Sequence, residues 1–495
     1  MTTSHDTATG PDIDTAATGN PGDDSVALPA GLDVHLERLR GVVDSGATDV
    51  PWRLAALRRL RRMLVDAGDE LADALAADLG KPRRESAISE IGVVIGDLDD
   101  VLRRVRRSAR PRPVSVPLVL APATAWVRRQ PYGLALVIAP WNYPLNLALA
   151  PIVGALGAGN TVVLKPSELA PATSATLARL LRRYVGDDAV VVVEGGAAET
   201  TALLQRRFDL VVYTGGARVG RIVAEAAARH LTPTVLELGG KSPVWVDETA
   251  DLDVAADRIV WGKLMNVGQT CVAPDHVLCT PAVAERLVPR LEAAITRMYG
   301  ADPRRSPDYG RAVTVDAARR LRAMAGLGPA PDADPRYVPP VVLTGAAATP
   351  AMTEEIFGPL LPVVTVDPAD PVTDAIARIR AGEKPLALYL FTRSADVRRR
   401  FTRETSSGAL GINVTVVHQT VPGLPFGGVG GSGYGNYHGR WSLATFSHDR
   451  AILAKPTRPD TLKVAYPPYR RLTDVVYGLQ ARRPRDWGRR RPPRA

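Results

Sequence analysis

The chain has 495 residues, 45% of them hydrophobic, and a formal net charge of +10 at pH 7. This length exceeds what one ordinary hydrophobic core fills, so we expect at least two packed lobes. No stretch of about 18 consecutive apolar residues occurs, which argues against a membrane-spanning helix. Only two cysteines are present, Cys271 and Cys279. So few thiols argue against a disulfide framework and favour a reducing, cytoplasmic compartment.

The charge is distributed unevenly along the chain. Residues 1–30 contain five Asp and no Lys or Arg, whereas nine Arg face two Asp from Arg470 onward. We expect residues 1–30 to be a disordered acidic tail, unlike a secretory leader, and residues 458–495 to be a basic Pro/Arg-rich tail. Arg outnumbers Lys 55 to seven over the whole chain, which favours a solvated tail over a nucleic-acid partner or a contact with an anionic membrane.

The first elements in chain order are helices. Residues 31–112 are rich in Arg and Leu with few breakers, and this pattern predicts amphipathic helices that cover a sheet. Between residues 131 and 240, short β-branched runs alternate with helical patterns, which is typical of a parallel sheet built from βαβ units. The predicted strands are Leu134–Ala139, Thr161–Leu164, Val190–Val193, Leu210–Tyr213 and Thr234–Leu238.

These strands predict a five-stranded doubly wound sheet of the α/β class. A helix is predicted between its last two strands, over Arg218–His230, because apolar residues recur there at helical spacing. A second α/β run, over residues 240–430, begins with a strand at Ser242–Val246 and contains another at Leu386–Phe391. Ligands of such sheets bind beyond the carboxyl ends of the strands, so we expect functional motifs directly after strands.

A thiol and a carboxylate stand in such positions. Cys271 follows a Gly-containing stretch rather than an apolar run, whereas Cys279 lies within Val277-Leu278-Cys279 and is interpreted as a core residue. Glu237 ends a predicted strand and has Leu on both sides. Partial burial would raise its pKa toward the range of a general base. A thiol nucleophile beside a desolvated carboxylate suits a covalent acyl intermediate that water then hydrolyses.

Two further motifs follow strands. Asn142 comes directly after the first strand of the sheet, and its amide NH2 could donate to an oxyanion. Gly215 and Gly216 open the helix that follows the fourth strand, so free backbone N–H groups would face an anion there. The spacing of these glycines is not that of the dinucleotide fingerprint.

Six motifs carry a resemblance to a known family. They are Pro140-Trp141-Asn142-Tyr143-Pro144, Leu164-Lys165-Pro166-Ser167-Glu168, Leu236-Glu237-Leu238-Gly239-Gly240-Lys241, Gly268-Gln269-Thr270-Cys271, Glu354-Glu355-Ile356-Phe357-Gly358-Pro359 and Leu424-Pro425-Phe426-Gly427-Gly428-Val429-Gly430. In order and spacing the chain resembles the aldehyde dehydrogenase superfamily over residues 35–468. Trp261-Gly262-Lys263, Tyr437-His438-Gly439 and Val464-Ala465-Tyr466-Pro467-Pro468 are similar to its class 3 branch.

The resemblance implies NAD(P)-dependent oxidation of medium-chain aliphatic or aromatic aldehydes to carboxylic acids. It implies that Cys271 attacks the aldehyde, that Asn142 and the Cys271 backbone N–H hold the oxyanion, and that Glu237 activates the hydrolytic water. It assigns the cofactor to Pro140, Trp141, Lys165, Ser167, Glu168, Gly215, Gly216, Val219, Leu238, Gly239, Glu355 and Phe357. Among these, Lys165 and Glu168 would bind the adenosine ribose, Glu355 the nicotinamide ribose, and Phe357 would position the ring. Glu168 favours NAD, with NADP possible.

The same resemblance implies a domain plan. Residues 31–112 and 131–238 would bind the cofactor, residues 239–430 would form the catalytic domain, and residues 113–130 with 445–457 would form an element through which a homodimer assembles. The chain departs from the family at Gly216, where most relatives carry Ser. This removes one hydroxyl donor and leaves phosphate contacts to the backbone.

Three alternatives to this activity remain open in the sequence. The acyl group could pass to coenzyme A instead of water, although Glu237 argues for hydrolysis. The scaffold could be non-catalytic, or Cys271 could pair with His276 in a Cys–His hydrolase. No His has metal-ligand spacing to another His or Cys, so we expect no metal site. His418 approaches the substrate tunnel by analogy, but a structural role is the simpler interpretation.

Overall fold

The computed structural model describes residues 31–345 and 350–469. The chain divides into two compact units, which we call the main unit and the arm unit. The main unit comprises residues up to Arg106 together with Pro131–Ser447, and the arm unit comprises Arg107–Gln130 together with the residues from His448 onward. The expected acidic tail, and the part of the basic tail from residue 470 onward, lie outside the described residues. Within the described part, no helix is both long and apolar enough to cross a membrane.

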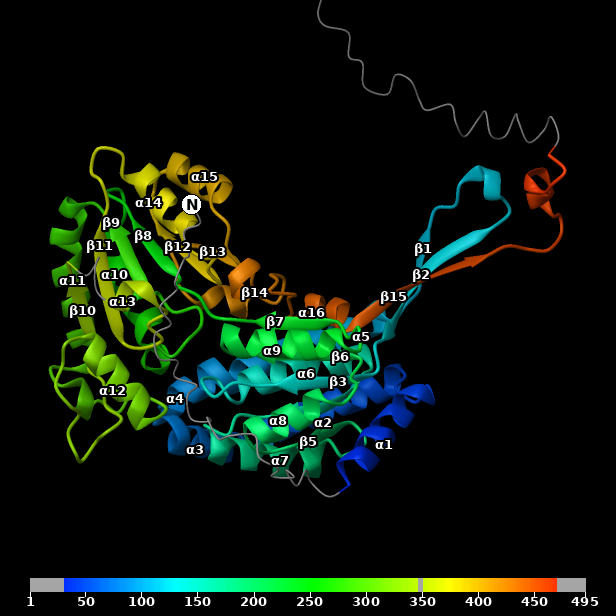
Figure 1. Cartoon of the computed structure of the whole chain (residues 1–495), viewed down its shortest axis with the longest axis horizontal. Helices are drawn as coiled ribbons and strands as arrows, with labels where there is room; N and C mark the ends of the chain where they lie inside the picture. Colours follow the sequence, from blue (N-terminus) through cyan, green and yellow to red (C-terminus); the bar gives the residue numbers. More distant parts are fainter. Residues whose placement is uncertain (1–30, 346–349, 470–495) are drawn as a thin grey trace, which may run out of the picture. The chain divides into compact units, whose positions relative to one another are not determined.

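The first sheet of the main unit has six strands in the order β14-β7-β6-β3-β4-β5 (Figure 1). Its strands are β3 (Leu134–Ile138), β4 (Thr161–Lys165), β5 (Val190–Val192), β6 (Leu210–Thr214), β7 (Thr234–Glu237) and β14 (Gly433–Tyr434). The five predicted strands are therefore present and parallel, with ends shifted by one residue. The prediction of five strands is wrong by one, because β14 pairs antiparallel with β7 from far along the chain and its two residues carry no periodic signal.

Alternation along the strands divides the core around this sheet. In β3, Ala135 and Val137 face the helices α2, α5, α6 and α7, whereas Leu134 and Leu136 face α1, α8 and α9. The covering helices are α1 (Leu32–Asp44), α2 (Val50–Asp66), α3 (Gly68–Leu79), α4 (Arg83–Ser86), α5 (Gly92–Ser108), α6 (Asn146–Ala158), α7 (Pro171–Tyr184), α8 (Ala197–Leu204) and α9 (Ala217–Ala228). This confirms the prediction of helices within residues 31–112 and of a doubly wound α/β sheet.

One turn of π-helix interrupts the N-terminal helices. Residues Ala87–Ile91 lie between α4 and α5, and the Gly92 N–H donates to the Ala87 carbonyl, five residues back. A side chain at position 92 would bring its Cβ to 2.7 Å from that carbonyl oxygen, so the turn depends on glycine. Single π-turns inside α-helices occur frequently at functional sites.

The second sheet is entirely parallel, in the order β10-β11-β9-β8-β12-β13. Its strands are β8 (Pro243–Val246), β9 (His276–Cys279), β10 (Val341–Thr344), β11 (Leu360–Thr365), β12 (Ala387–Phe391) and β13 (Ala409–Ile412). The helices that follow in this part of the chain are α10 (Leu252–Leu264), α11 (Pro281–Tyr299), α12 (Val315–Met324), α13 (Pro350–Thr353), α14 (Pro371–Ala381), α15 (Ala395–Glu404) and α16 (Arg440–Thr445). One hydrophobic cluster reaches from the first sheet into the second.

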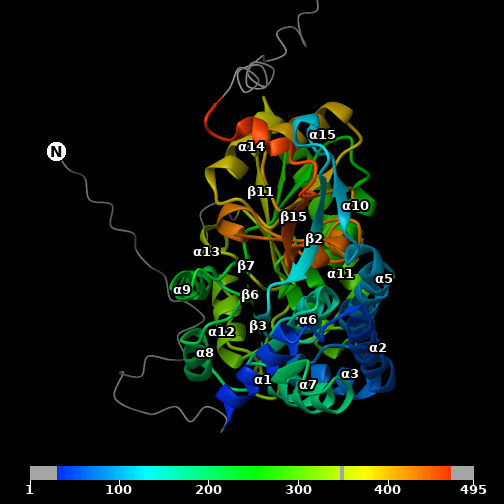
Figure 2. The same ribbon diagram turned by 90° about the vertical axis from the view of Figure 1, so that its right-hand side faces the viewer.

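The arm unit contains the segments expected to mediate oligomerisation. Strands β1 (Arg112–Val114), β2 (Thr124–Pro131) and β15 (Ser447–Ala454) form a three-stranded sheet in the order β1-β2-β15 (Figure 2). Within it, the Asp449 carboxylate accepts from Arg112 at 2.6 Å and from Arg129 at 3.3 Å. The expected segments therefore form a sheet, and the role of this sheet in oligomerisation stays a prediction.

We expect Gly154→Ala to destabilise the protein. Gly154 lies in α6, every residue of which is buried, and a Cβ there would lie 2.8 Å from both the Phe446 ring and the Ser442 side chain. Overpacking of this kind typically costs about 1–3 kcal/mol. Thermal or urea unfolding measures it.

The matched control is Gly41→Ala in α1, where a Cβ would meet nothing within 4 Å. Ala is about 0.5–1 kcal/mol better than Gly inside a helix, so this variant should be at least as stable as the parent. Equal effects of the two substitutions would contradict the packing argument.

Candidate active site

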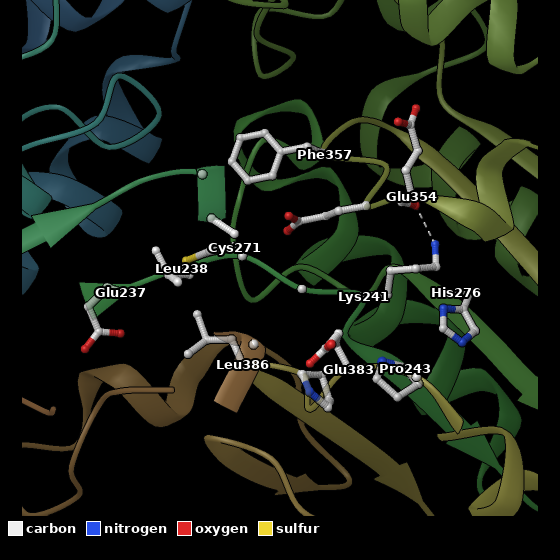
Figure 3. A pocket seen from close by; sticks show the side chains of 18 of the residues that line it. Glu237, Leu238, Lys241, Pro243, Cys271, His276, Glu354, Phe357, Glu383 and Leu386 are labelled. Atoms are coloured by element: carbon white, nitrogen blue, oxygen red, sulfur yellow. Dashed lines mark hydrogen bonds between the residues drawn. The ribbon is translucent and has the colours of Figure 1, made fainter. Parts of the chain in front are cut away.

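A cavity of about 870 Å³ lies in the main unit where strands of the first sheet end. The residues that follow β3, β6 and β7 line one wall, as expected for a doubly wound sheet. The other walls come from the second α/β run. Eleven of the predicted site residues line this cavity: Pro140, Trp141, Asn142, Gly215, Gly216, Glu237, Leu238, Gly239, Cys271, Glu355 and Phe357. Figure 3 shows Cys271 between Glu237 and the Phe357 ring.

Cys271 is partly exposed and unpaired. It follows a tight turn in which Asn266 and Val267 adopt positive φ angles of 50° and 57°. Non-glycine residues in this conformation are uncommon and cluster at active sites, where the surrounding structure must hold them. Burial, followed by the charges of Glu355 and Glu237, raises the pKa of the Cys271 thiol to about 12. The thiol is therefore protonated at neutral pH, and attack on a substrate requires that its proton be removed.

Glu237 is more deeply buried than the sequence predicted. The residue is 2% exposed, and among residues 31–345 and 350–469 neither carboxyl oxygen has a hydrogen-bond partner. Burial raises the pKa of this carboxyl well above its usual value, which confirms the expected direction. The hydrogen-bonding capacity of both oxygens is therefore unused by the described part of the chain.

Asn142 is held in place by the turn that precedes Cys271. The amide is 4% exposed, and its Nδ2 donates to the Gln269 carbonyl at 3.0 Å. An amide NH2 carries two N–H groups, so the second remains as a donor toward the cavity. The backbone N–H groups of Cys271 and Val272 face the Cys271 sulfur, which gives the site several donors around one point.

A second carboxylate lies across the cavity. Glu355 is half-buried, and desolvation by the surrounding protein raises its pKa to about 8, with Lys241 and Lys263 acting in the opposite direction. Gly239 passes so close to Glu355 that a Cβ at position 239 would collide with the carboxylate. A side chain at position 239 would therefore displace the Glu355 carboxylate from its place in the cavity. Phe357, at a φ of 49°, packs edge-on against Trp141 with ring centroids 5.5 Å apart.

The N-terminus of α9 faces the same cavity. Gly216 is the N-cap of the helix and offers no capping side chain, and the N-terminus of a helix favours an anion. This is the arrangement expected from the glycine at position 216. Val219 lies on α9 and does not appear among the lining residues, so its role stays a prediction.

Three predicted cofactor residues lie at the carboxyl end of β4: Lys165 is its last residue, and Ser167 and Glu168 follow it. None of the three lines the cavity. Lys165 is buried and donates to Glu168 at 2.8 Å, to the Pro166 carbonyl at 2.8 Å and to the Gly195 carbonyl at 2.6 Å. The Glu168 side chain is 52% exposed. The pair is thus preorganised at the carboxyl edge of the sheet, one strand away from the cavity, and its contact with a ribose stays a prediction.

Several lining residues were not predicted from the sequence. Lys241 donates to Asp275 at 2.6 Å and to the Glu354 carbonyl at 2.8 Å (Figure 3), and it belongs to the same motif as Glu237, which was the available signal. Thr214 lies beside Glu237 in the register of β6 and β7. Arg320, Arg378 and Glu383 also line the cavity, but no local pattern singles them out.

The two histidines considered in the sequence, His276 and His418, contact side chains other than Cys271. His276 lines the cavity, but its Nδ1 lies 3.1 Å from the Asp275 carboxylate. The charged groups that act on the Cys271 pKa are carboxylates rather than imidazoles. His418 is stacked on Phe426 at 6.1 Å, and burial lowers its pKa to about 4, so it is neutral at physiological pH.

Comparisons with known proteins identify the family of the chain. Residues 44–452 match the aldehyde dehydrogenase family. Aldehyde dehydrogenase family 3 member B1 of Homo sapiens is 46% identical over 456 residues, which cover 90% of this chain and 97% of that protein. A substrate-bound structure of Staphylococcus aureus AldH has a TM-score of 0.87 at 37% identity, covering 90% of this chain and 99% of that one. An NAD-dependent aldehyde dehydrogenase from Sinorhizobium meliloti has a TM-score of 0.76 at 27% identity, with 86% and 87% covered.

The fold and the paired thiol and carboxyl groups define a dehydrogenase scaffold, and the comparisons give the family. The chain belongs to the aldehyde dehydrogenase family and is an aldehyde dehydrogenase. Its similarity to family 3 proteins places it with the class 3 branch.

We expect Glu237→Gln to become more stable than the parent chain as pH rises. Because the folded-state pKa of Glu237 is raised, the parent has its full stability below the ordinary carboxyl pKa and loses stability above it. The loss is at most about 1.4 kcal/mol per pH unit until the folded-state pKa is reached. Gln cannot ionise, so thermal unfolding at pH 5 and pH 8 should show a stability gap that widens with pH.

Glu225→Gln is the control, since Glu225 is exposed on α9. Its curve should run parallel to that of the parent. A gap for Glu237→Gln that narrows between pH 5 and pH 8 would contradict the assignment of Glu237 as a buried acid.

Proposed function

We propose that the protein oxidises medium-chain aliphatic or aromatic aldehydes to carboxylic acids, with Cys271 as nucleophile and Glu237 as the base for hydrolysis. The observation that carries this proposal is the buried, unpartnered Glu237 carboxyl on the wall of the cavity that Cys271 also lines. A base in this position is needed for attack by water and not for attack by a thiol, which favours hydrolysis over transfer to coenzyme A.

A nicotinamide dinucleotide fits the residues of this cavity. The N-terminus of α9, which has no capping side chain, would face the pyrophosphate, Glu355 would accept from the nicotinamide ribose, and Phe357 would lie against the ring. Lys165 and Glu168 would hold the adenosine ribose. When bound, the cofactor accepts the hydride that leaves the substrate carbon.

The residues of the chain divide the remaining work into two stages. In the first, the Cys271 S–H bond breaks and its proton passes to solvent, the sulfur forms a bond to the aldehyde carbon, and the second N–H of Asn142 with the Cys271 backbone N–H stabilises the oxygen that becomes negative. Loss of hydride from that carbon then leaves a thioester on Cys271. In the second stage Glu237 takes a proton from water, the hydroxyl adds to the thioester carbon, and the carbon–sulfur bond breaks to release the acid and restore the thiol.

Cys271→Ser should abolish dehydrogenase activity, because a hydroxyl of far higher pKa cannot replace the thiolate. Glu237→Gln should instead show a burst of reduced cofactor approaching one per active site, followed by turnover slowed about 10²–10⁴-fold. Rapid mixing with NAD and an aldehyde, without coenzyme A, distinguishes the two variants. If Glu237 also deprotonates Cys271, the burst itself will slow, and raising the pH will restore it.

Cys279→Ala is the matched control, because Cys279 is a buried thiol in β9 outside the cavity lining. This variant should keep its turnover. An undiminished steady-state rate in Glu237→Gln would show that another group is the base, and activity that requires coenzyme A would favour the acyl-transfer alternative.

We propose that NAD is used at least as well as NADP. The exposed Glu168 carboxylate, fixed by the buried Lys165, can accept from a ribose 2′-OH and would repel a 2′-phosphate. Glu168→Gln should therefore raise the ratio of NADP to NAD activity, measured as kcat/KM, whereas Glu225→Gln should not. A parent enzyme with a strong preference for NADP would refute the argument.

We also propose a homodimer that assembles through the arm unit. Apolar side chains of the arm unit that are exposed in the single chain support this proposal. They include Val114, Leu118 and Leu453, which a second copy could cover. Sedimentation velocity at micromolar concentration should give a dimer, and a monomer or a tetramer would count against the proposal. A cytoplasmic location stays an expectation from the low cysteine content.

A further inference from the structure

A buried ion pair lies behind Asn142 and takes no part in the steps above. Lys81 Nζ lies 2.5 Å from Glu90 Oε1, and both side chains are fully buried. Taking two charges out of water is costly, and their attraction seldom does more than offset that cost. Apolar residues of similar size would serve stability as well, so the pair calls for another explanation.

The pair holds both ends of the turn that carries Asn142. Lys81 Nζ donates to the Asn142 carbonyl at 3.2 Å and lies 4.1 Å from the centroid of the Tyr143 ring. The other carboxylate oxygen of Glu90, Oε2, accepts from the Asn146 backbone N–H at 2.8 Å. One ion pair therefore fixes the turn where it leaves β3 and where it enters α6.

The π-turn at Ala87–Ile91 places Glu90 against the turn that carries Asn142. Lys81 precedes α4, and Glu90 lies inside the π-turn, so the extra residue of that turn sets the direction from which Glu90 approaches. A functional constraint is the usual reason for retaining such a turn.

The same segment also contacts the turn before Cys271. Glu85 Oε1 accepts from the Asn266 backbone N–H at 2.8 Å. The Asn266 side chain donates to the Asn142 carbonyl at 2.7 Å and to the Gln269 carbonyl at 3.1 Å. The Asn142 carbonyl thus receives two donors, Lys81 Nζ and Asn266 Nδ2, while the Asn142 amide is bonded to the carbonyl of Gln269.

We propose that Lys81 and Glu90 are positioning residues for oxyanion stabilisation, acting through the backbone of Asn142. This inference rests on the proposed role of Asn142. A displacement of a catalytic group by about 1 Å can cost on the order of 10²-fold in rate, so weakening one of the two donors to the Asn142 carbonyl should slow acylation measurably without preventing folding.

The test uses Lys81→Met, Glu90→Gln and the double variant, each in a Glu237→Gln background in which the acyl-enzyme accumulates. Rapid mixing with saturating NAD and aldehyde gives the burst rate, which is normalised to the number of Cys271 thiols that iodoacetamide can alkylate. Thermal unfolding of the same samples gives Tm.

We expect each single variant to lose Tm, because it leaves one buried charge unpaired. The double variant should recover most of that loss, since it removes both charges of the pair, yet its burst should stay about tenfold or more slower than that of the Glu237→Gln parent, with the KM for NAD unchanged. A purely structural role would restore Tm and burst rate together. If a single variant does not fold, the double variant still decides.

Asp78→Asn is the matched control. Asp78 is a buried carboxylate of the same helical layer that accepts from the Ala172 and Thr173 backbone N–H groups and not from Lys81 or the Asn142 turn. It should lose Tm but keep its burst rate per thiol within about twofold. A double variant with a burst rate within twofold of the parent overturns the inference alone. If the Glu237→Gln parent shows no burst at all, the proposed function is overturned, and the inference with it.

Discussion

Desolvation of Glu237 governs the chemistry of this site. A carboxyl group at the end of a central strand, with no partner on either oxygen, can be buried only while it is neutral or while a ligand contacts it. Cys271 lines the same cavity, and burial is likewise the main cause that raises the pKa of its thiol. Nucleophile and base therefore rest in protonated, unreactive forms, and the arrangement of donors around them determines when they become active.

The backbone around the site is strained at three residues. Asn266, Val267 and Phe357 all adopt positive φ, and the loops that contain them meet at the cavity. Such conformations persist only when neighbouring groups fix them. The Asn142, Asn266 and Gln269 amides bond to each other's backbone carbonyls, and that network provides the restraint. Rigidity in this region is what a preorganised oxyanion site requires.

The sequence predicted those parts of the molecule that local patterns encode. The five parallel strands carry β-branched runs, and Glu237 and Cys271 stand directly after such signals. What could not be predicted depends on contacts between distant segments. Strand β14 has two residues and pairs with β7 about 200 positions away, and Lys81 reaches Asn142 across 61 positions. Neither contact leaves a periodicity, and a lysine before a proline reads locally as an ordinary surface residue. The full burial of Glu237 was also beyond local reasoning, because it depends on which elements close over the end of the strand.

The raised pKa of Cys271 has a consequence for oxidative damage. Peroxides and disulfides react with the thiolate far faster than with the thiol. A pKa near 12 leaves only a minute fraction of Cys271 ionised at neutral pH. Between turnovers the nucleophile should therefore resist conversion to sulfenic or sulfinic acid, although it is partly exposed. Oxidation would then be confined to the moments when the thiol has lost its proton.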